Sequence, residues 1–516
     1  MESNCQKLDL INTGAFPKLF LDYISKKTSL EDFYGNFPDL DGFKNQLNSA
    51  SFSVEKRTVL VDTLKKQYKD LTNIPDIDLL LDPRTFTVTT GHQLNIFTGP
   101  LYIIYKIVCI INLSKSLKKA FPEYNFVPVY WMATEDHDFE EISYFNLFGQ
   151  KHVWETEQRG AVGRMHPGEL RSILDVLREK PAIFENAYLN SHCLADAVRH
   201  YMHELFGAEG LISIDADDRN LKSLFKEVIK DDLFKHSAVK TVTEVSGKLD
   251  GLGYKTQIHP REINFFYLDE GIRERIERQG DQWKVVNSPL GFTEAEILNL
   301  IENEPEKFSP NVVLRPLFQE TILPNLAYIG GPSEVPYWLQ LKGVFDHYKT
   351  NFPILMPRNF ALIVNAGLYK KAEKLGVAID ELFDDEVSLR KRFVERNSEN
   401  SLSLAFEIDE ISEVFRRIAL KAQAIDQTLK PAVDAENAKF SNALENLEKK
   451  LKKAEERHFE TSVTQLLNLR EKLFPGGGLQ ERKENLLNFY LNDPQFLEKL
   501  LNAFDPLDFR FNILYV

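Results

Sequence analysis

The chain has 516 residues, of which 43% are apolar and 27% are charged, and its net charge is −14. This length predicts roughly two to four globular domains rather than a single core. The negative charge argues against nucleic-acid binding, which needs a cationic face. No apolar run approaches the ~18 residues of a membrane span, no signal peptide is expected, and three cysteines without paired spacing fit a reducing cytoplasm.

Residues 1–84 are predicted to form a helical segment that packs on the core. The next stretch, Thr85–Thr90, is rich in β-branched residues and predicts a buried strand that ends at Gly91. Thr98 or Gly99 is the expected cap of a following helix, Leu101–Leu117, which is apolar nearly all round and therefore buried. The pattern is strand, loop and helix.

This loop suggests an anion site. Free N–H groups at a helix start attract phosphate or carboxylate, and His92 can donate to a phosphate oxygen. The alternative is an ordinary strand-to-helix turn with a capping threonine. On the functional interpretation His92 is catalytic, and the phosphate-binding candidates are Gly91, Gln93, Thr98 and Gly99.

A second strand-like stretch, Val127–Asp138, ends in an acidic cluster. In an open α/β sheet ligands bind at the carboxyl ends of strands, so both loops are expected at one edge. The cluster can hold an amino group, tune a histidine base or bind a divalent metal, although no spacing here matches a metal motif. The alternative is a solvated loop that caps the next helix. The candidates are Asp136 and His137 as catalytic residues and Glu135 and Asp138 as substrate-binding residues.

Further strands are predicted downstream. Leu211–Asp215 ends in three aspartates, for which helix capping is favoured over a role in a cleft. Hairpin signals predict a small α+β insertion at 239–300, and Asn311–Leu314 and Phe352–Leu355 are expected to return to the sheet. The core thus comprises residues 85–238 and 301–366.

Two more patches are candidate binding elements. Gly330 and Gly331 can let a ligand approach the backbone, while Glu334 and Trp338 define a pocket; the alternative is a tight turn into a helix capped by Ser333. Arg358 can clamp a phosphate or carboxylate, although a lone arginine is more often a surface charge.

Residues 367–474 are charge-rich and helical. An apolar heptad pattern there predicts a coiled-coil arm, with Pro431 marking the turn between antiparallel helices. The arm can pair with a second copy in a homodimer or pack on its own core. The tail, 475–516, is expected to return to the core. The heptad positions are Phe440, Leu444, Leu447, Leu451 and Ala454.

Four motifs together resemble the BshC family, whose members are named as cysteine ligases of bacillithiol biosynthesis. They are TGHQLNIFTGPLYIIYK, PVYWMATEDHDFEEI, YIGGPSEVPYW and LFPGGGLQER, and they cover most of the chain in order. The resemblance implies an α/β fold, with a Rossmann-like parallel-sheet core similar to class I aminoacyl-tRNA synthetases and nucleotidylyltransferases, inserted connecting segments and a long helical coiled-coil arm. It also implies the joining of L-cysteine to glucosaminyl-malate.

Two function classes follow. The first is an ATP-dependent ligase, with Mg²⁺ as an accompanying ion, that activates the cysteine carboxylate for attack by the glucosamine amine. The second is a non-catalytic nucleotide-binding scaffold. Class I synthetases carry a His-x-Gly-His loop and a Lys-rich loop, whereas this chain has Gly91-His92-Gln93 and no clear Lys-rich counterpart. The missing loop favours the scaffold, and the intact rim loops favour the ligase.

Overall fold

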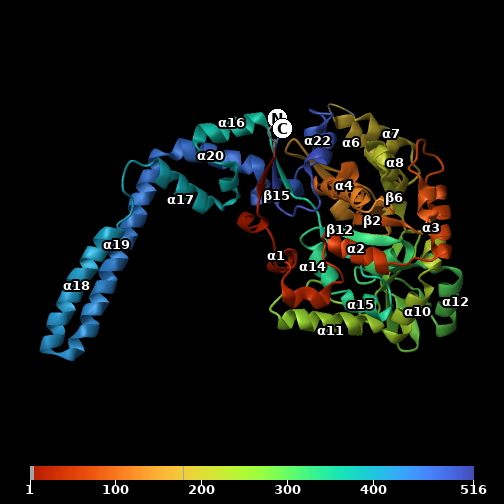
Figure 1. Ribbon diagram of the computed structural model, residues 1–516, viewed down its shortest axis with the longest axis horizontal. Helices are drawn as coiled ribbons and strands as arrows, with labels where there is room; N and C mark the ends of the chain where they lie inside the picture. The colour runs from red at the N-terminus through yellow and green to blue at the C-terminus, as the bar shows by residue number, and fades with distance from the viewer. Residues whose placement is uncertain (1–4, 178, 180) are drawn as a thin grey trace. The chain divides into compact units, whose positions relative to one another are not determined.

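The computed structural model describes residues 5–177, 179 and 181–516. The chain folds into two compact units (Figure 1). The first unit ends at Leu362 and also contains Gln480–Leu514, and the second contains Ile363–Leu479 and the last two residues.

A five-stranded parallel sheet forms the centre of the first unit, in the order β13-β12-β2-β3-β6. The first strand to enter it, β2, has β3 on one side and the later β12 on the other. Strand order therefore reverses between β2 and β12, and such a switch point is where open α/β sheets bind ligands. The bounds are β2 (Thr85–His92), β3 (Asn125–Met132), β6 (Ile212–Asp215), β12 (Asn325–Gly330) and β13 (Ile354–Pro357). The predicted Rossmann-like α/β fold is confirmed.

Threonines account for much of β2, and each finds a partner inside the sheet. The hydroxyls of Thr87 and Thr89 donate to Asn325 Oδ1, at 3.0 and 2.7 Å, and Thr90 donates to the carbonyl of Ile329. These bonds tie β2 to β12, and β-branched side chains suit a buried strand. The predicted buried helix is confirmed as α4 (Tyr102–Ala120), which packs against β2 and β3.

Helices and short strands surround this sheet in the first unit (Figure 1). Strand β1 (Cys5–Leu8) pairs antiparallel with β15 (Phe511–Tyr515), so the C-terminal segment returns to the first unit. The remaining elements are α1 (Lys18–Ile24), α2 (Leu40–Ser49), α3 (Val54–Gln67), α5 (Phe139–Ile142), β4 (Tyr144–Leu147), β5 (Gln150–Val153), α6 (Arg171–Val176), α7 (Ala182–Asn190), α8 (Leu194–Phe206), α9 (Arg219–Ser223), α10 (Lys226–Lys235), α11 (Ser237–Gly251), α13 (Arg315–Ile322), α14 (Glu334–Leu339), α15 (Lys342–His347), α21 (Leu487–Tyr490) and α22 (Phe496–Ala503).

A second, antiparallel sheet follows α11, in the order β10-β9-β8-β7-β11. Its strands are β7 (Phe265–Asp269), β8 (Ile272–Gln279), β9 (Gln282–Val285), β10 (Gly291–Phe292) and, after α12 (Glu294–Asn303), β11 (Phe308–Pro310). The expectation that Asn311–Leu314 would be a strand is wrong. These residues turn instead into α13, because the Asn311 side chain accepts from Val313 N–H and Pro316 sits in the first turn of the helix.

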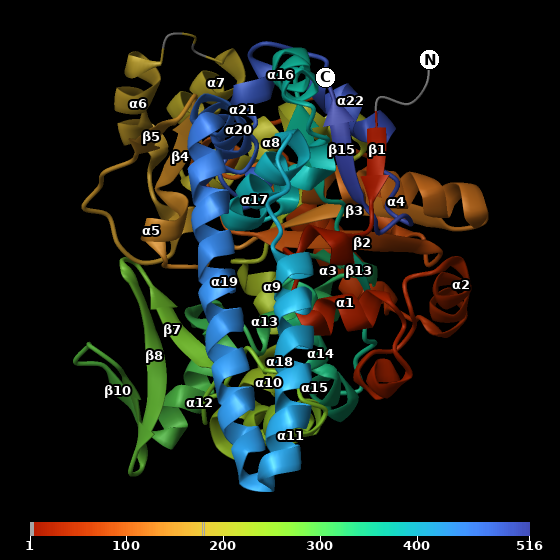
Figure 2. The same ribbon diagram turned by 90° about the vertical axis from the view of Figure 1, so that its left-hand side faces the viewer.

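The second unit is helical. Its elements are α16 (Ala366–Leu375), α17 (Glu386–Asn397), α18 (Ala405–Ile425), α19 (Lys430–His458) and α20 (Glu460–Leu473), and β14 (Ala361–Val364) spans the boundary between the units. Helices α18 and α19 run side by side as a hairpin (Figure 2). Pro431 lies in the first turn of α19, directly after the reversal. None of the helices in the described part of the chain is both long and apolar enough to cross a membrane.

One buried acid of the first unit predicts a pH dependence of stability. Burial raises the pKa of Glu320 to about 8, although Gln319 and Asn325 donate to its carboxyl group. An unfolded chain releases this proton near 4.5, the ordinary value. The unfolding free energy should therefore fall as the pH rises from 4.5 to about 8, by up to ~1.4 kcal/mol per pH unit from this group.

Glu320→Gln keeps an acceptor oxygen but cannot ionise, so it should flatten that decline. Urea denaturation of both proteins at several pH values measures the effect. The same pH slope in wild type and variant would mean that Glu320 ionises at its ordinary pKa in the folded protein.

Candidate functional site

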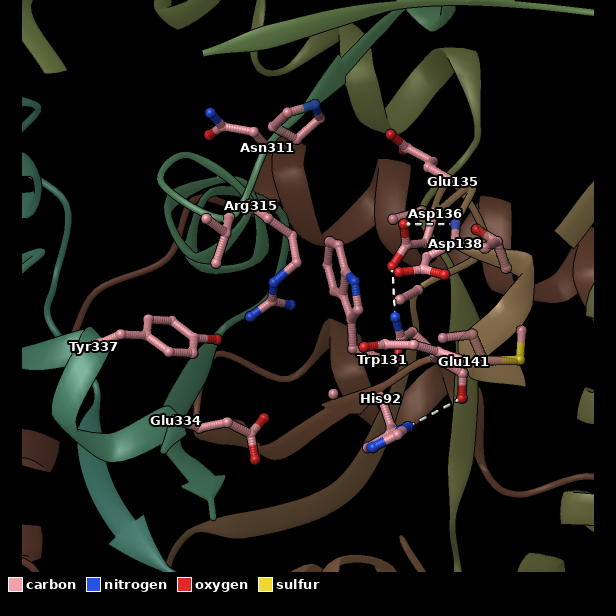
Figure 3. A pocket seen from close by; sticks show the side chains of 18 of the residues that line it. His92, Trp131, Glu135, Asp136, Asp138, Glu141, Asn311, Arg315, Glu334 and Tyr337 are labelled. Carbon is pink, nitrogen blue, oxygen red and sulfur yellow. Dashed lines mark hydrogen bonds between the residues drawn. The ribbon is translucent and has the colours of Figure 1, made fainter. Parts of the chain in front are cut away.

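A cavity of about 760 Å³ lies at the carboxyl ends of β2, β3, β12 and β13 (Figure 3). This is the edge where the strand order reverses. Three loop segments line it, 91–93, 131–138 and 331–334, together with four arginines: Arg273, Arg315, Arg358 and Arg482. The structure thus gathers three of the loops that the sequence singled out.

Most predicted site residues do line the cavity. They are Gly91, His92, Gln93, Glu135, Asp136, His137, Asp138, Gly331, Ser333, Glu334 and Arg358. Four predicted residues are not brought into it: Thr98, Gly99, Gly330 and Trp338.

Thr98 and Gly99 lie buried under the C-terminal segment. Asn485 donates to the carbonyls of Phe97 and Gly99, both at 2.7 Å, and Leu101 N–H donates to the carbonyl of Glu484. The predicted cap is wrong, because Leu101 takes the N-cap position with no side-chain bond. The N–H group of this N-cap residue is therefore used within the protein, and neither Thr98 nor Gly99 enters the proposed site.

Trp338 belongs to the core. Its ring stacks on Tyr328, with centroids 4.3 Å apart, and also contacts Phe345 and Phe352. The expected wall of the pocket is supplied instead by Tyr337, the preceding residue. Gly330 is the buried last residue of β12.

Gly91 leaves room for an arginine. A Cβ atom at this position would lie 3.3 Å from Arg315 Nη1 and 3.7 Å from Trp131. The carbonyl of Gly91 accepts from Lys106 Nζ at 2.9 Å. The absence of a side chain at Gly91 thus allows Arg315 to approach the backbone closely.

His92 is held by its neighbours on both ring nitrogens. Nδ1 lies 3.3 Å from the carbonyl oxygen of Gln93, and this oxygen can only accept a hydrogen bond. Nε2 lies 2.8 Å from the Tyr102 hydroxyl. Burial and the nearby Lys106 charge lower the pKa of His92 to about 3, so the ring is neutral. The sequence analysis expected His92 to donate to a phosphate oxygen. In this arrangement neither ring nitrogen is left to do so.

Lys106 is a site-supporting residue that the sequence analysis missed. Its side chain is 1% exposed, and Nζ lies 2.5 Å from Glu334 Oε2. Glu334 also accepts from Gly331 N–H and from the Tyr328 hydroxyl, both at 2.8 Å. Burial alone would raise the pKa of Glu334, but Lys106 outweighs it and lowers the pKa to about 2. The sequence did contain a signal for this role, because Lys106 is a charged residue in the middle of the apolar part of α4.

The acidic loop is built around Asp136. Its Oδ1 accepts from His137 N–H at 2.8 Å, and its Oδ2 accepts from Gln93 Nε2 at 2.8 Å. Gln93 therefore joins the two loops instead of facing a phosphate alone. Asp138 takes the N-cap position of α5 but makes no side-chain capping bond, so the capping alternative does not explain its carboxylate.

Glu135 belongs to a buried network of charged side chains. It pairs with Lys222 Nζ at 3.1 Å, and the same ammonium lies 3.4 Å from Asp217. Burial raises the pKa of Glu135, Lys222 opposes the shift, and Asp217 adds to it. The acids after β6 thus support Glu135 from behind. Among them Asp218 caps α9, as predicted, by accepting from two backbone N–H groups.

Arg315, at the start of α13, points into the cavity (Figure 3). Nη1 donates to Gln319 Oε1 at 3.1 Å, while Nη2 is buried with no hydrogen-bond partner among the described residues. Its guanidinium lies over the rings of Trp131 and Tyr328. A buried, unpaired N–H group is costly unless a ligand accepts from it, so this donor indicates a site for an anion.

The cavity has two electrostatic sides. Figure 3 shows Glu135, Asp136, Asp138 and Glu141 on one side of Trp131, and Arg315 with Glu334 on the other. Lys106 pairs with Glu334, and Arg273 lies 3.7 Å from Asp136 on the acidic side. Arg358 and Arg482 add positive charge, although Arg358 is already paired with Glu481. This arrangement can bind an anionic group and an amine in one cavity. In the described residues no group of three or more His, Cys, Asp or Glu side chains is placed to hold a metal ion.

Comparisons with known proteins cover the full length. Residues 3–359 match the family model "Bacillithiol biosynthesis BshC, N-terminal Rossmann-like domain", and residues 361–516 match "Bacillithiol biosynthesis BshC, C-terminal coiled-coil domain". Relatives named "Putative cysteine ligase BshC" occur in Cytophaga hutchinsonii, with 42% identity over 98% of both chains, and in Flavobacterium psychrophilum, with 42% identity over 97% of this chain and 98% of the relative. A relative of the same name in Salinibacter ruber is 31% identical over 95% of this chain and 94% of its own.

Proposed function

Because the chain belongs to the BshC family of bacillithiol biosynthesis, we propose that it is an ATP-dependent ligase that joins L-cysteine to glucosaminyl-malate. The proposal rests on one observation above all, the Arg315 guanidinium, which points into the cavity and whose buried Nη2 has no hydrogen-bond partner among the described residues. A guanidinium group matches the paired oxygens of a phosphate. ATP carries such groups, and the donor set of this cavity fits it.

Arg315 would hold the phosphates of ATP together with Arg482, the exposed arginine of the same rim. Lys106 would act behind them, by holding Gly91 and Glu334 in place. Mg²⁺ would be bound mainly by phosphate oxygens, with one or two carboxylates of the acidic loop, as is usual for this ion. ATP supplies the activation that makes the cysteine carboxylate electrophilic.

The acidic side would take the amine of glucosaminyl-malate. An ammonium group must lose a proton before its nitrogen can attack. Burial raises the pKa of Glu135, which makes this carboxylate a better proton acceptor than an ordinary glutamate. The amide bond forms between the carboxyl carbon of cysteine and this nitrogen. One carboxylate oxygen leaves with the phosphoryl product. The ammonium group loses two protons in all, the first to Glu135 before the attack and the second to solvent as the amide bond forms.

A reconstituted reaction tests the proposal. Purified protein is mixed with ATP, L-cysteine and glucosaminyl-malate, and the thiol product and nucleotide are followed by mass spectrometry. We expect consumption of glucosaminyl-malate only when both other substrates are present. ATP binding without any turnover would favour the nucleotide-binding scaffold instead.

We also propose that the arm joins two copies of the chain. One member of the predicted heptad stripe contacts α18, since the rings of Phe440 and of Phe415 on α18 lie 5.4 Å apart. Of its members only Leu444 is half-buried, whereas Phe440, Leu447 and Leu451 are 52%, 46% and 39% exposed. The leucines that stay exposed on this helix of 29 residues, Leu447 and Leu451, fit a second copy of the same helix.

Leu447→Asp combined with Leu451→Asp should therefore dissociate the dimer and leave the helix content unchanged. Burial of each leucine between copies would contribute roughly 1.5–3 kcal/mol, and a buried carboxylate adds a penalty. Sedimentation velocity and circular dichroism measure the two effects. Lys449→Asp with Lys453→Asp, on the polar side of α19, is the matched control. Equal mass for wild type, the leucine variant and the lysine variant would contradict a dimer held by these leucines.

A further inference from the structure

Arg273 reaches the cavity from the antiparallel sheet. It lies on β8, its side chain is only 8% exposed, and its guanidinium stacks over Phe266 at 4.1 Å. Nε donates to Ser309 Oγ at 3.1 Å, and Nη2 donates to the carbonyl of Pro310 at 3.4 Å. The remaining nitrogen, Nη1, lies 2.7 Å from Nδ1 of His137. The arginine is thus held rigidly against one edge of the imidazole.

This contact decides which ring nitrogen of His137 carries a proton. Arginine has only donors, so Nδ1 must accept and must itself be unprotonated. A neutral ring with a bare Nδ1 has its proton on Nε2. No described residue forms a hydrogen bond with Nε2, and His137 lines the cavity and is about half exposed. An imidazole held in this way offers a ligand a donor and not a base.

We propose that Arg273 holds His137 as the neutral Nε2–H tautomer, and that Nε2–H donates a hydrogen bond to a substrate oxygen that gains negative charge in the reaction. This rests on the proposed ligase function. The oxygen belongs to the cysteine carboxyl group or to the phosphate bound to it, the two places where charge develops during acyl activation and transfer. His137 is then a catalytic hydrogen-bond donor, and Arg273 is a positioning residue. Proton acceptance is left to Glu135.

The charges around His137 are mixed. Arg273 and Glu274 face it from β8, and Asp136 and Asp138 face it from its own loop. Burial lowers the pKa of His137 first and Arg273 lowers it further, while the three carboxylates oppose the shift. Removal of the guanidinium should therefore raise the pKa of His137 and release the tautomer.

The tautomer can be read without any substrate. Protein labelled with ¹⁵N in the histidine rings is examined by long-range ¹H–¹⁵N correlation, and His137 is assigned by comparison with His137→Gln. We expect a pyridine-like Nδ1 and a pyrrole-like Nε2. Arg273→Met should allow the proton to exchange between Nδ1 and Nε2, whereas Arg275→Met, two residues along the same strand face, should leave it on Nε2. A protonated Nδ1 in wild type would overturn the proposal.

Kinetics then separate donor from base. The side-chain amide introduced by His137→Gln can place an N–H near the former Nε2, whereas the shorter side chain in His137→Asn reaches only the former Nδ1. We expect His137→Ala to lose about 10²-fold in kcat, His137→Gln to recover most of it, and His137→Asn to recover little. Equal rates for the Gln and Asn variants would overturn the donor role. Absence of ligation by wild type would instead refute the proposed function and leave the tautomer result standing.

Discussion

Replacement of Glu481 by leucine is expected to destabilise the first unit by about 3–5 kcal/mol. Glu481 and Arg358 are both almost fully buried, with 0% and 2% exposure, and Glu481 Oε1 lies 2.5 Å from Arg358 Nη2. The leucine leaves the Arg358 guanidinium buried without a counter-charge. The guanidinium still donates to the carbonyl of Asn359, but this hydrogen bond does not offset the loss of the carboxylate. Urea denaturation monitored on the first unit measures the loss.

A double variant provides the control. Arg358→Met combined with Glu481→Leu removes both charges and should recover much of the lost stability, because a buried pair often contributes little beyond an apolar pair of similar size. A loss below ~1 kcal/mol in the single variant, the size of an exposed pair, would contradict the burial of this ion pair.

Arg315→Ala is expected to lower kcat/KM for ATP by about 10²–10³-fold with little change in stability. Nη2 has no partner among the described residues and is the donor to which a phosphate would bind, and the variant removes this donor together with the positive charge. Arg315→Lys should recover only part of the rate, because an ammonium keeps the charge but not the planar fork. Steady-state kinetics and calorimetric ATP binding measure the two losses.

Arg171→Ala is a suitable control for that variant, since Arg171 is also the first residue of a helix but is exposed and does not line the cavity. It should behave as wild type. Wild-type kinetics for Arg315→Ala would remove the main support for the nucleotide site.

The sequence was sufficient for features that depend on neighbours along the chain. The β-branched run of β2 and the apolar helix α4 follow from local patterns, and so does the acidic loop after β3. Because parallel strands place their carboxyl ends at one edge, the meeting of these loops was also predictable. The family resemblance added the Rossmann-like fold and the coiled-coil arm, and the family models bear out both.

Contacts between distant segments were beyond such reasoning. The local sequence at Thr98 and Gly99 predicts an anion site at a helix start. In the structure Asn485, almost 400 positions later, donates hydrogen bonds to the carbonyls of Phe97 and Gly99 and occupies this place. Arg273 and Arg315 carried no motif and become site residues only because the antiparallel sheet and α13 place them at the cavity. Trp338 resembled a pocket wall because its partners in the core, such as Phe352, are remote in sequence.

The central claim is that ATP activates the carboxylate of cysteine in this cavity. Cysteine labelled with ¹⁸O in its carboxylate tests it most directly, with the phosphoryl products analysed by mass spectrometry after reaction with glucosaminyl-malate. We predict one labelled oxygen in AMP or inorganic phosphate for each amide bond formed. Amide formation without label in either product, or no amide at all, would contradict the claim.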